Sequence, residues 1–194
     1  MRPATDAAGG PLLRRRALLL VPLLGAGIIG IAFFLMLQRM GEGRFDPHGI
    51  PSPLIGKPMP DFDLPAQAPG SGFSAADVRA AGHPVLINFF ASWCIPCAEE
   101  APELMKLSQA GVSIWGIAYK DGEAAARGFL TRYGDPYGRL ARDTSGRVAI
   151  NFGLYGVPET DFIDKQGIVR WRWAGPLTPD IISEQLEPLL RKYR

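Results

Sequence analysis

The stretch Asn88-Phe89-Phe90-Ala91-Ser92-Trp93-Cys94-Ile95-Pro96-Cys97 decides how the rest of this chain is interpreted. The apolar run 85–90 that leads into it has the length of a strand and is typical of one covered on both faces. A turn follows with the chain's only two cysteines, and we expect a helix over 97–110. The C-x-x-C spacing allows a small disulfide ring that can open and close. The stretch therefore predicts redox chemistry at Cys94 and Cys97.

The expected helix assigns different roles to the two sulfurs. Cys94 would lie at the helix N-terminus, where unpaired backbone N–H groups favour the nucleophilic thiolate. Cys97, one turn inside, would be shielded and would resolve a mixed disulfide. Pro96 rigidifies the turn, and Trp93 offers a flat apolar wall beside the sulfurs. Asn88 is the polar residue of the strand: it either satisfies a backbone group or acts beside the thiols, and the residues leave both readings open.

Other uses of a C-x-x-C pair fit the sequence less well. A structural disulfide is disfavoured because so short a loop removes little entropy from the unfolded chain. Covalent haem attachment needs His after the second Cys, and Ala98 stands there. A zinc site needs four ligands, and only the distant His48 and His83 could add to the thiolates. We expect no cofactor and no metal, although a two-thiolate Cu(I) site remains chemically open.

The N-terminal region predicts a membrane anchor. Residues 17–37 carry no charge, and their number is about what a helix needs to cross a bilayer core. Arg14, Arg15 and Arg16 precede this run, so residues 1–16 should form a cytoplasmic tail and the bulk should be exported. A cleaved signal peptide would have a shorter apolar region, and here the run continues past the poor cleavage site 25–27. We expect a single-pass protein of a bacterial inner membrane, with its catalytic domain in the periplasm.

The remaining chain divides into a linker and one domain. Residues 38–53, rich in Pro, Gly and charged residues, are expected to be a linker, and 54–194 a single folded domain. Residues 1–44 hold six of the 21 basic and two of the 19 acidic residues, which leaves 15 basic and 17 acidic in 45–194. This slightly acidic body shows no basic patch with interleaved aromatics, so nucleic acid is not an expected partner.

Hydrophobic periodicity predicts an α/β domain in which strands alternate with helices and a hairpin closes the sheet. In the hairpin, Val169, Trp171 and Trp173 should share one face, and Arg170 and Arg172 the other. The expected elements are a short strand at 61–64, a helix capped by Ser74 and ending at Gly82, a strand at 85–90, a helix at 97–110 kinked by Pro102, a strand at 112–119, a helix at 123–133, a short strand at 140–143, a short helix at 145–152, hairpin strands at 159–163 and 168–173, and a helix at 180–192.

These residues resemble a thioredoxin-fold protein. Trp93-Cys94-Ile95-Pro96-Cys97 is similar to the active-site motif, Pro102 stands at the kink proline, and Gly156-Val157-Pro158 is similar to the cis-proline loop. Within that fold, 88–94 and 155–160 are similar to the membrane-anchored thiol:disulfide interchange proteins of cytochrome c maturation, the DsbE/CcmG type of the TlpA-like family. The resemblance covers about 54–192 and implies a mixed central sheet flanked by helices, with an N-terminal extension and a central insertion within 121–150.

The resemblance also implies roles for individual residues. Pro158 would be cis and pack against the disulfide, and Gly156, Val157 and Pro158 would bind the partner's backbone. Glu100 and Glu159 would match acidic residues near the active site, where negative charge opposes thiolate formation and makes the site less oxidising. Spacing alone equally allows both to be solvated surface charges.

At four residues the sequence differs from the usual pattern of this family or from ordinary thioredoxins. Asn88 would stand in place of the buried Asp of ordinary thioredoxins. Asp161 occupies a position that is usually aromatic or aliphatic, which leaves open how buried that strand is. Ile95-Pro96 is closer to general thioredoxin usage than to the Pro-Thr pair of some members.

The expected function is reduction of disulfides in the C-x-x-C-H haem sites of apocytochrome c, or in another periplasmic C-x-x-C protein. Electrons would come from a transmembrane thiol carrier of the DsbD/CcdA kind. Two alternatives stay open. One is a related anchored reductase for copper-site assembly in oxidase. The other is a non-catalytic module that binds apocytochrome or Cu(I).

Overall fold

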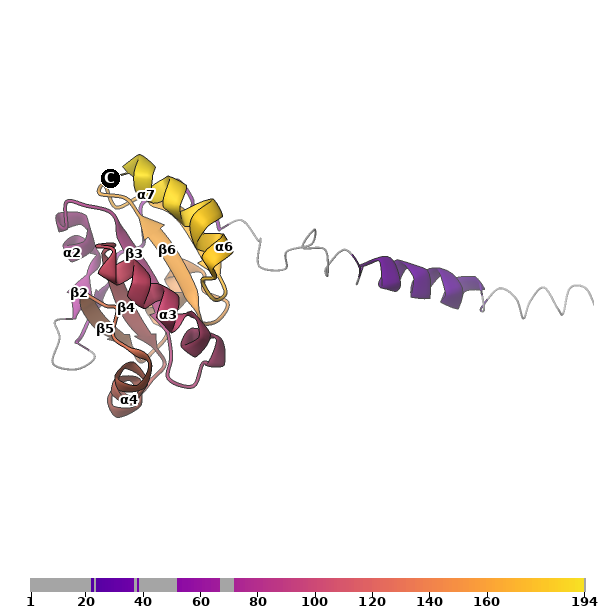
Figure 1. The fold of residues 1–194 in the computed structure, drawn as a ribbon, viewed down its shortest axis with the longest axis horizontal. Coiled ribbons are helices and arrows are strands. Elements are labelled where there is room, and N and C mark those ends of the chain that lie inside the picture. Colours follow the sequence, from indigo (N-terminus) through magenta and orange to yellow (C-terminus); the bar gives the residue numbers. More distant parts are fainter. Residues whose placement is uncertain (1–21, 23, 37, 39–51, 67–71, 194) are drawn as a thin grey trace, which may run out of the picture. The chain divides into compact units, whose positions relative to one another are not determined.

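The computed structural model describes residues 22, 24–36, 38, 52–66 and 72–193 (Figure 1). The chain separates into two compact units, Met1–Pro47 and His48–Arg194, each of which is described by itself.

In the first unit, the described residues 22, 24–36 and 38 have helical backbone. Within the part of the chain that the structure describes, no helix combines the length and the apolar character needed to cross a membrane. The predicted anchor 17–37 lies partly outside the described residues, as do the tail 1–16 and most of the linker 38–53. Anchor, tail and linker therefore stay predictions.

The second unit is built on a five-stranded mixed sheet with the order β5-β4-β3-β6-β7. β3 (Val85–Phe90) is central, and all six of its residues are buried. β4 (Ile114–Tyr119) and β5 (Arg139–Asp143) run parallel to it on one side. β6 (Glu159–Ile163) and β7 (Val169–Ala174) continue the sheet antiparallel on the other. This sheet confirms the predicted α/β fold with a mixed sheet. The apolar run of β3 lies at its centre because such a strand needs cover on both faces.

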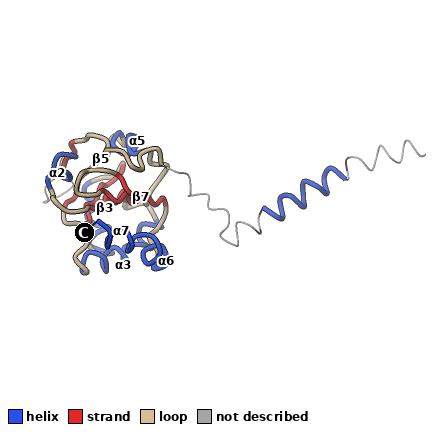
Figure 2. The backbone as a smooth tube through the Cα atoms, turned by 90° about the horizontal axis from the view of Figure 1, so that it is seen from above, coloured by secondary structure: helices blue, strands red, loops and turns tan. Residues whose placement is uncertain are grey.

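Helices cover both faces of this sheet, as Figure 2 shows for α2 and α5 on one side and α3, α6 and α7 on the other. Side chains of β3 alternate between the faces. Leu86 packs with α3 (Ile95–Gln109) and the C-terminal helix, and Phe90 with α4 (Glu123–Tyr133). Ile87 and Phe89 pack with α2 (Ala75–Ala80) and α5 (Arg147–Phe152).

A small hairpin precedes α2. Its strands, β1 (Asp63–Leu64) and β2 (Phe73–Ser74), pair antiparallel, so the strand expected at 61–64 is only two residues long. The Ser74 side chain caps α2 and the Asp77 carboxylate accepts from the Ser74 backbone N–H, which makes a capping box. The N-cap predicted at Ser74 is confirmed.

The helix after the cysteines begins earlier than the sequence predicts. α3 starts at Ile95 rather than at residue 97, because Cys94 itself is the N-cap and its Sγ accepts from the Cys97 N–H. Pro96 lies in the first turn, where its missing N–H costs no helical hydrogen bond. Pro102 lies inside the helix as expected.

The face assignment of the β7 side chains is wrong at Val169. Val169 joins the core on the α2 and α5 side, whereas Trp171 and Trp173 pack on the α3 side. The pairs Phe162↔Trp171 and Ile163↔Val169 skip Arg170, so the hairpin contains a β-bulge at this point. The extra residue of a bulge shifts the alternation of side chains between the two faces of the sheet. A prediction that assumes strict alternation along the strand cannot anticipate this shift.

The C-terminal helix is continuous but irregular. It consists of α6 (Pro179–Ile181), a π-helical turn (Ile182–Leu186) and α7 (Glu187–Tyr193). Pro188 has no N–H to donate to the preceding turn, and the π-helical segment lies directly before it.

Candidate active site

Cys94 and Cys97 form a disulfide at the junction of β3 and α3. The S–S bond is 2.09 Å long and the two Cα atoms are 5.3 Å apart. The Cys97 N–H donates to Cys94 Sγ at 3.1 Å. Cys97 lies in the first turn of the helix, where backbone N–H groups have no partner within the helix. Charge on the Cys94 sulfur is therefore favoured by this N–H and by the helix N-terminus when the bond is opened.

The Cys94 sulfur is more enclosed than the sequence predicts. Cys94 is only 5% exposed and Cys97 is buried, while Trp93 and Ile95 beside them are 59% and 75% exposed. Cys94 still opens onto the surface through a pocket of about 120 Å³. That pocket is lined by Ser92, Trp93, Cys94, Ile95, Ala98, Phe129 and Tyr133. Cys94 thus borders a small surface pocket whose wall includes the exposed side chains of Trp93, Ile95 and Tyr133.

The proline loop contacts the hydrophobic cluster that contains the two cysteines. The Val157–Pro158 peptide bond is cis, and Pro158 is buried. Val157 packs against the hydrophobic cluster that contains both cysteines, while Gly156 is exposed. The Pro158 carbonyl accepts from the Gly175 N–H at 2.9 Å, which ties the loop to the end of β7. The structure brings together the C-x-x-C turn and the loop that the resemblance assigns to partner binding.

Glu100 lies on the buried face of the active-site helix α3, so its reading as a solvated charge is wrong. Its carboxylate accepts from Asn88 Nδ2 and from the Leu177 N–H, both at 3.0 Å. Asn88 also donates to Thr160 Oγ1 at 3.1 Å. Burial raises the pKa of Glu100 to about 7, against the lowering effect of these two hydrogen bonds. Asn88 thus joins β3, α3 and β6 through side chains rather than serving a backbone group.

Tyr137 is a site residue that sequence reasoning missed. It lies between α4 and β5, in the expected central insertion, and its O–H donates to Asn88 Oδ1 at 2.6 Å. Its ring stacks on Phe90 with centroids 5.0 Å apart. Because the Asn88 oxygen accepts this O–H, the Asn88 amide nitrogen is the atom directed at Glu100. A lone Tyr in a loop carries no spacing signal that could have revealed this.

Glu159 is also buried, directly after the proline loop. Its carboxylate accepts from Arg172 Nε at 2.7 Å and from the Arg172 guanidinium again at 2.5 Å. Burial raises the pKa of Glu159 to about 7, and the pairing with Arg172 acts in the opposite direction. The surface-charge reading is wrong here too.

Asp161 lies two residues further along β6 and is fully buried, which answers the question that the sequence left open. Neither of its carboxyl oxygens has a hydrogen-bond partner within the described residues. Burial raises the pKa of Asp161 well above its usual range, and the neighbouring Glu159 adds to the effect. Asp161 therefore keeps its proton to a higher pH than an ordinary aspartate does.

Asp121 lies two residues after the end of β4 and holds the turn that precedes Trp93. Its carboxylate accepts from the Ser92 N–H at 2.6 Å and from the Ser92 O–H at 2.9 Å. The sequence marked Asp121 only as the start of the insertion. Its role depends on β4 and β3 ending side by side in a parallel pair, which no local pattern states.

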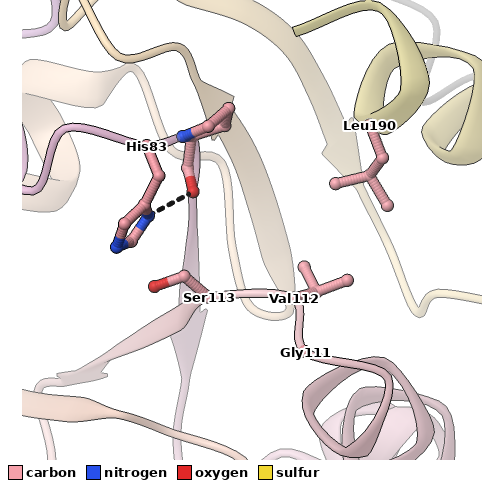
Figure 3. Close-up of a pocket in the computed structure, with 6 residues that line it drawn as sticks. His83, Gly111, Val112, Ser113 and Leu190 are labelled. Carbon is pink, nitrogen blue, oxygen red and sulfur yellow. Dashed lines mark hydrogen bonds between the residues drawn. The ribbon is translucent and has the colours of Figure 1, made fainter. Parts of the chain in front are cut away.

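A larger pocket of about 220 Å³ lies at the opposite end of β3 (Figure 3). It is lined by His83, Pro84, Gly111, Val112, Ser113 and Leu190, residues that precede β3 and β4 or lie on α7. His83 Nδ1 lies 3.0 Å from the Pro84 carbonyl oxygen. No cluster of three or more His, Cys, Asp or Glu suited to a metal occurs in the described ranges. The redox chemistry belongs to the other end of the strand.

The known proteins to which this chain is similar are thiol:disulfide interchange proteins, as the redox pair of this site leads one to expect. The chain is 40% identical over 179 residues to the thiol:disulfide interchange protein DsbE of Escherichia coli K12, covering 92% of this chain and 96% of that protein. This chain belongs to the DsbE-type thiol:disulfide interchange proteins. HelX of Rhodobacter capsulatus, also a thiol:disulfide interchange protein, is 40% identical over 90% of the chain and 96% of its own length. The AhpC/TSA family matches residues 55–172.

Solved structures of thiol:disulfide interchange proteins and their relatives are similar in fold to this chain. A candidate DsbE from Chlorobium tepidum has a TM-score of 0.60 and 27% identity, covering 72% of this chain and 96% of that one. MTB DsbF, solved in mixed oxidized and reduced forms, has a TM-score of 0.58 and 27% identity over 66% and 94% of the two chains. The expected thioredoxin-like fold is confirmed, and this DsbE-type chain is a thiol:disulfide oxidoreductase with its redox pair at Cys94 and Cys97.

Proposed function

We propose that this protein is a membrane-anchored periplasmic reductase that opens C-x-x-C-H disulfides in apocytochrome c during cytochrome c maturation. The observation that carries the proposal is a pair of buried carboxyl groups, Glu100 and Glu159, behind a C-x-x-C disulfide in a DsbE-type chain. A group with a pKa near 7 in this position becomes charged as the pH rises and then disfavours a second negative charge on the sulfurs. A less stable thiolate shifts the equilibrium between dithiol and disulfide toward the disulfide. A protein whose own disulfide is favoured acts as a reductant of other disulfides.

The proposed reaction transfers two electrons. The Cys94 thiolate attacks one sulfur of the partner's disulfide, and the partner's other sulfur leaves as a thiolate. The Cys97 thiolate then attacks Cys94 Sγ and displaces the remaining partner sulfur. The partner gains two electrons and takes up two protons, and this protein is left with the Cys94–Cys97 disulfide seen in the structure. A transmembrane thiol carrier of the DsbD/CcdA kind would return the electrons.

Capture of the partner tests the substrate. A Cys97→Ser variant lacks the resolving thiol, so we expect it to accumulate a mixed disulfide through Cys94 with apocytochrome c. The complex is detected on non-reducing gels of cells blocked with an alkylating agent, and the attached protein is identified by mass spectrometry. The matched control is Cys94→Ser/Cys97→Ser, which should capture nothing.

The identity of the captured protein decides between the candidates. Apocytochrome c supports the proposal. A copper-site protein of oxidase in its place would support the related reductase of oxidase assembly and would contradict the proposal.

The location is a separate proposal, supported by the uncharged run 17–37 and the three arginines before it. We expect the full chain to stay in the membrane pellet after extraction with alkaline carbonate, because a spanning helix resists this treatment. A peripheral membrane protein of the same cells serves as the control and should be released. Release of this chain into the supernatant would contradict an uncleaved anchor.

A further inference from the structure

The segment 153–159 connects α5 to β6, whose first residue is Glu159, and carries the proline loop of the site. Its middle residues, Tyr155, Gly156 and Val157, form no backbone–backbone hydrogen bond within the described chain. Tyr155 is 65% exposed, while Val157 packs against the cluster of the two cysteines. Backbone hydrogen bonds hold Leu154, through Ala149, and Pro158, through Gly175, but not the three residues between them.

One side chain contacts the segment at three points. The Arg172 guanidinium donates to the Gly153 carbonyl at 2.9 Å, where the segment begins. It lies over the ring of Tyr155, with its central carbon 4.8 Å from the ring centroid. It also donates twice to the Glu159 carboxylate, where the segment ends. Arg172 lies on β7, across the hairpin, and its side chain is only 4% exposed.

These three contacts need a guanidinium. Its planar fork presents several N–H donors in fixed directions while its face stacks on an aromatic ring. A lysine ammonium at the same place would keep the charge but could not form the two-bond pairing with Glu159 and the stacking on Tyr155 together. Both charges of the pair are buried, so the contact is not weakened by solvent as a surface pair would be.

We propose that Arg172 is a positioning residue that holds segment 153–159 in the shape a partner polypeptide must meet beside Cys94. Arg172 acts through the loop and does not itself take part in thiol exchange. A small disulfide needs only access to Cys94, whereas a polypeptide must also align along the loop. Loss of Arg172 therefore slows exchange with polypeptides relative to exchange with small disulfides. A change in the reactivity of the Cys94 thiolate affects both rates and cancels in their ratio.

The chain contains a matched control on the same strand. Arg170 also donates to a buried carboxylate, with Nε 2.6 Å from Asp164 Oδ2, and its central carbon lies 5.3 Å from the ring centroid of Tyr193. It has the same kinds of partner as Arg172, but Asp164 and Tyr193 lie outside segment 153–159. Replacing either arginine disturbs an ion pair with a buried carboxylate, although the Arg170 side chain is 33% exposed. Only the replacement of Arg172 disturbs the loop.

The experiment compares two oxidants of the reduced full chain. One is a peptide closed by a C-x-x-C-H disulfide, a choice that rests on the proposed function, and the other is bis(2-hydroxyethyl) disulfide. For Arg172→Lys we expect the ratio of the peptide rate to the small-disulfide rate to fall at least about tenfold, because misplacement by about 1 Å can cost about a hundredfold in rate. For Arg170→Lys the ratio should stay within about twofold of the unmodified protein's.

A ratio that falls equally in both arginine variants, or in neither, overturns the proposal. Should Arg172→Lys fail to fold, Tyr155→Leu decides, because it removes the stacking ring from an exposed position. The ratio should then fall, and an unchanged ratio overturns the proposal. A second peptide with Ala in place of the His separates this result from the proposed function. Equal rates with both peptides contradict a haem-site substrate, and the arginine ratio can still be read on either peptide.

Discussion

A Cys94→Ser variant should lose thiol:disulfide exchange by at least about a thousandfold, because a serine hydroxyl cannot replace the attacking thiolate. The fold should survive. Serine is a preferred N-cap residue, so the cap on α3 that Cys94 provides would be kept. The disulfide that is lost closes only a short loop and contributes little to stability through the unfolded chain.

The measurement is the rate at which the reduced protein opens a peptide disulfide, followed by the fluorescence change of Trp93 beside the sulfurs. Cys97→Ser is the control, since it keeps the attacking sulfur and should still form the first mixed disulfide at close to the normal rate. Exchange that persists in Cys94→Ser would contradict catalysis at this sulfur. Cellular function that persists in Cys94→Ser would instead favour the non-catalytic binding module.

Stability should fall as the pH rises from about 5 to 8, with the buried Glu100 as one cause. Its pKa is raised from an ordinary 4.5 to about 7, so the folded state binds a proton that the unfolded state has already released. The stabilisation is fully present below the unfolded pKa and is lost as the pH rises through the folded pKa. The shift corresponds to about 3 kcal/mol for Glu100. The raised pKa of Glu159 acts in the same direction.

Glu100→Gln should flatten this pH dependence, because glutamine does not titrate. The measurement is the free energy of unfolding by urea at pH 5 and at pH 8, with the disulfide kept oxidised. The difference between the two pH values is compared, since glutamine also loses one of the two hydrogen bonds that Glu100 accepts. Glu103→Gln is a matched control on the same helix, where the partly exposed Glu103 pairs with Lys106. If Glu100→Gln and Glu103→Gln have the same pH dependence, Glu100 is not the source.

Much of the fold could be predicted because it follows from neighbouring residues. The apolar run 85–90 indicated a doubly covered strand, and the Ser74–Asp77 spacing indicated a helix start, as the structure has them. Predictions failed where the chain departs from a regular period. The bulge at Arg170 moved Val169 to the opposite face, and Cys94 began its helix two residues early by acting as its cap.

The candidate site divides in the same way. Cys94, Cys97, Trp93 and Pro96 lie within one short stretch and could be found by their spacing. Tyr137, Asp121 and Arg172 could not, since each acts on a residue far away in sequence. Arg172 reaches Gly153 across 19 positions and Tyr137 reaches Asn88 across 49. No single-residue signal distinguishes them from ordinary loop or strand residues.

The sequence by itself determined that this protein has a redox pair at the start of a helix that follows a buried strand, because spacing, capping and hydrophobic period act over a few residues. Only the tertiary structure decided which carboxyl groups are buried around that pair. Glu100 is enclosed because Leu177, 77 positions away, folds over it, and Asn88 reaches it while also bonding Thr160, 72 positions away. Burial is set by segments that meet only in the folded chain, and it is burial that raises the pKa of these acids.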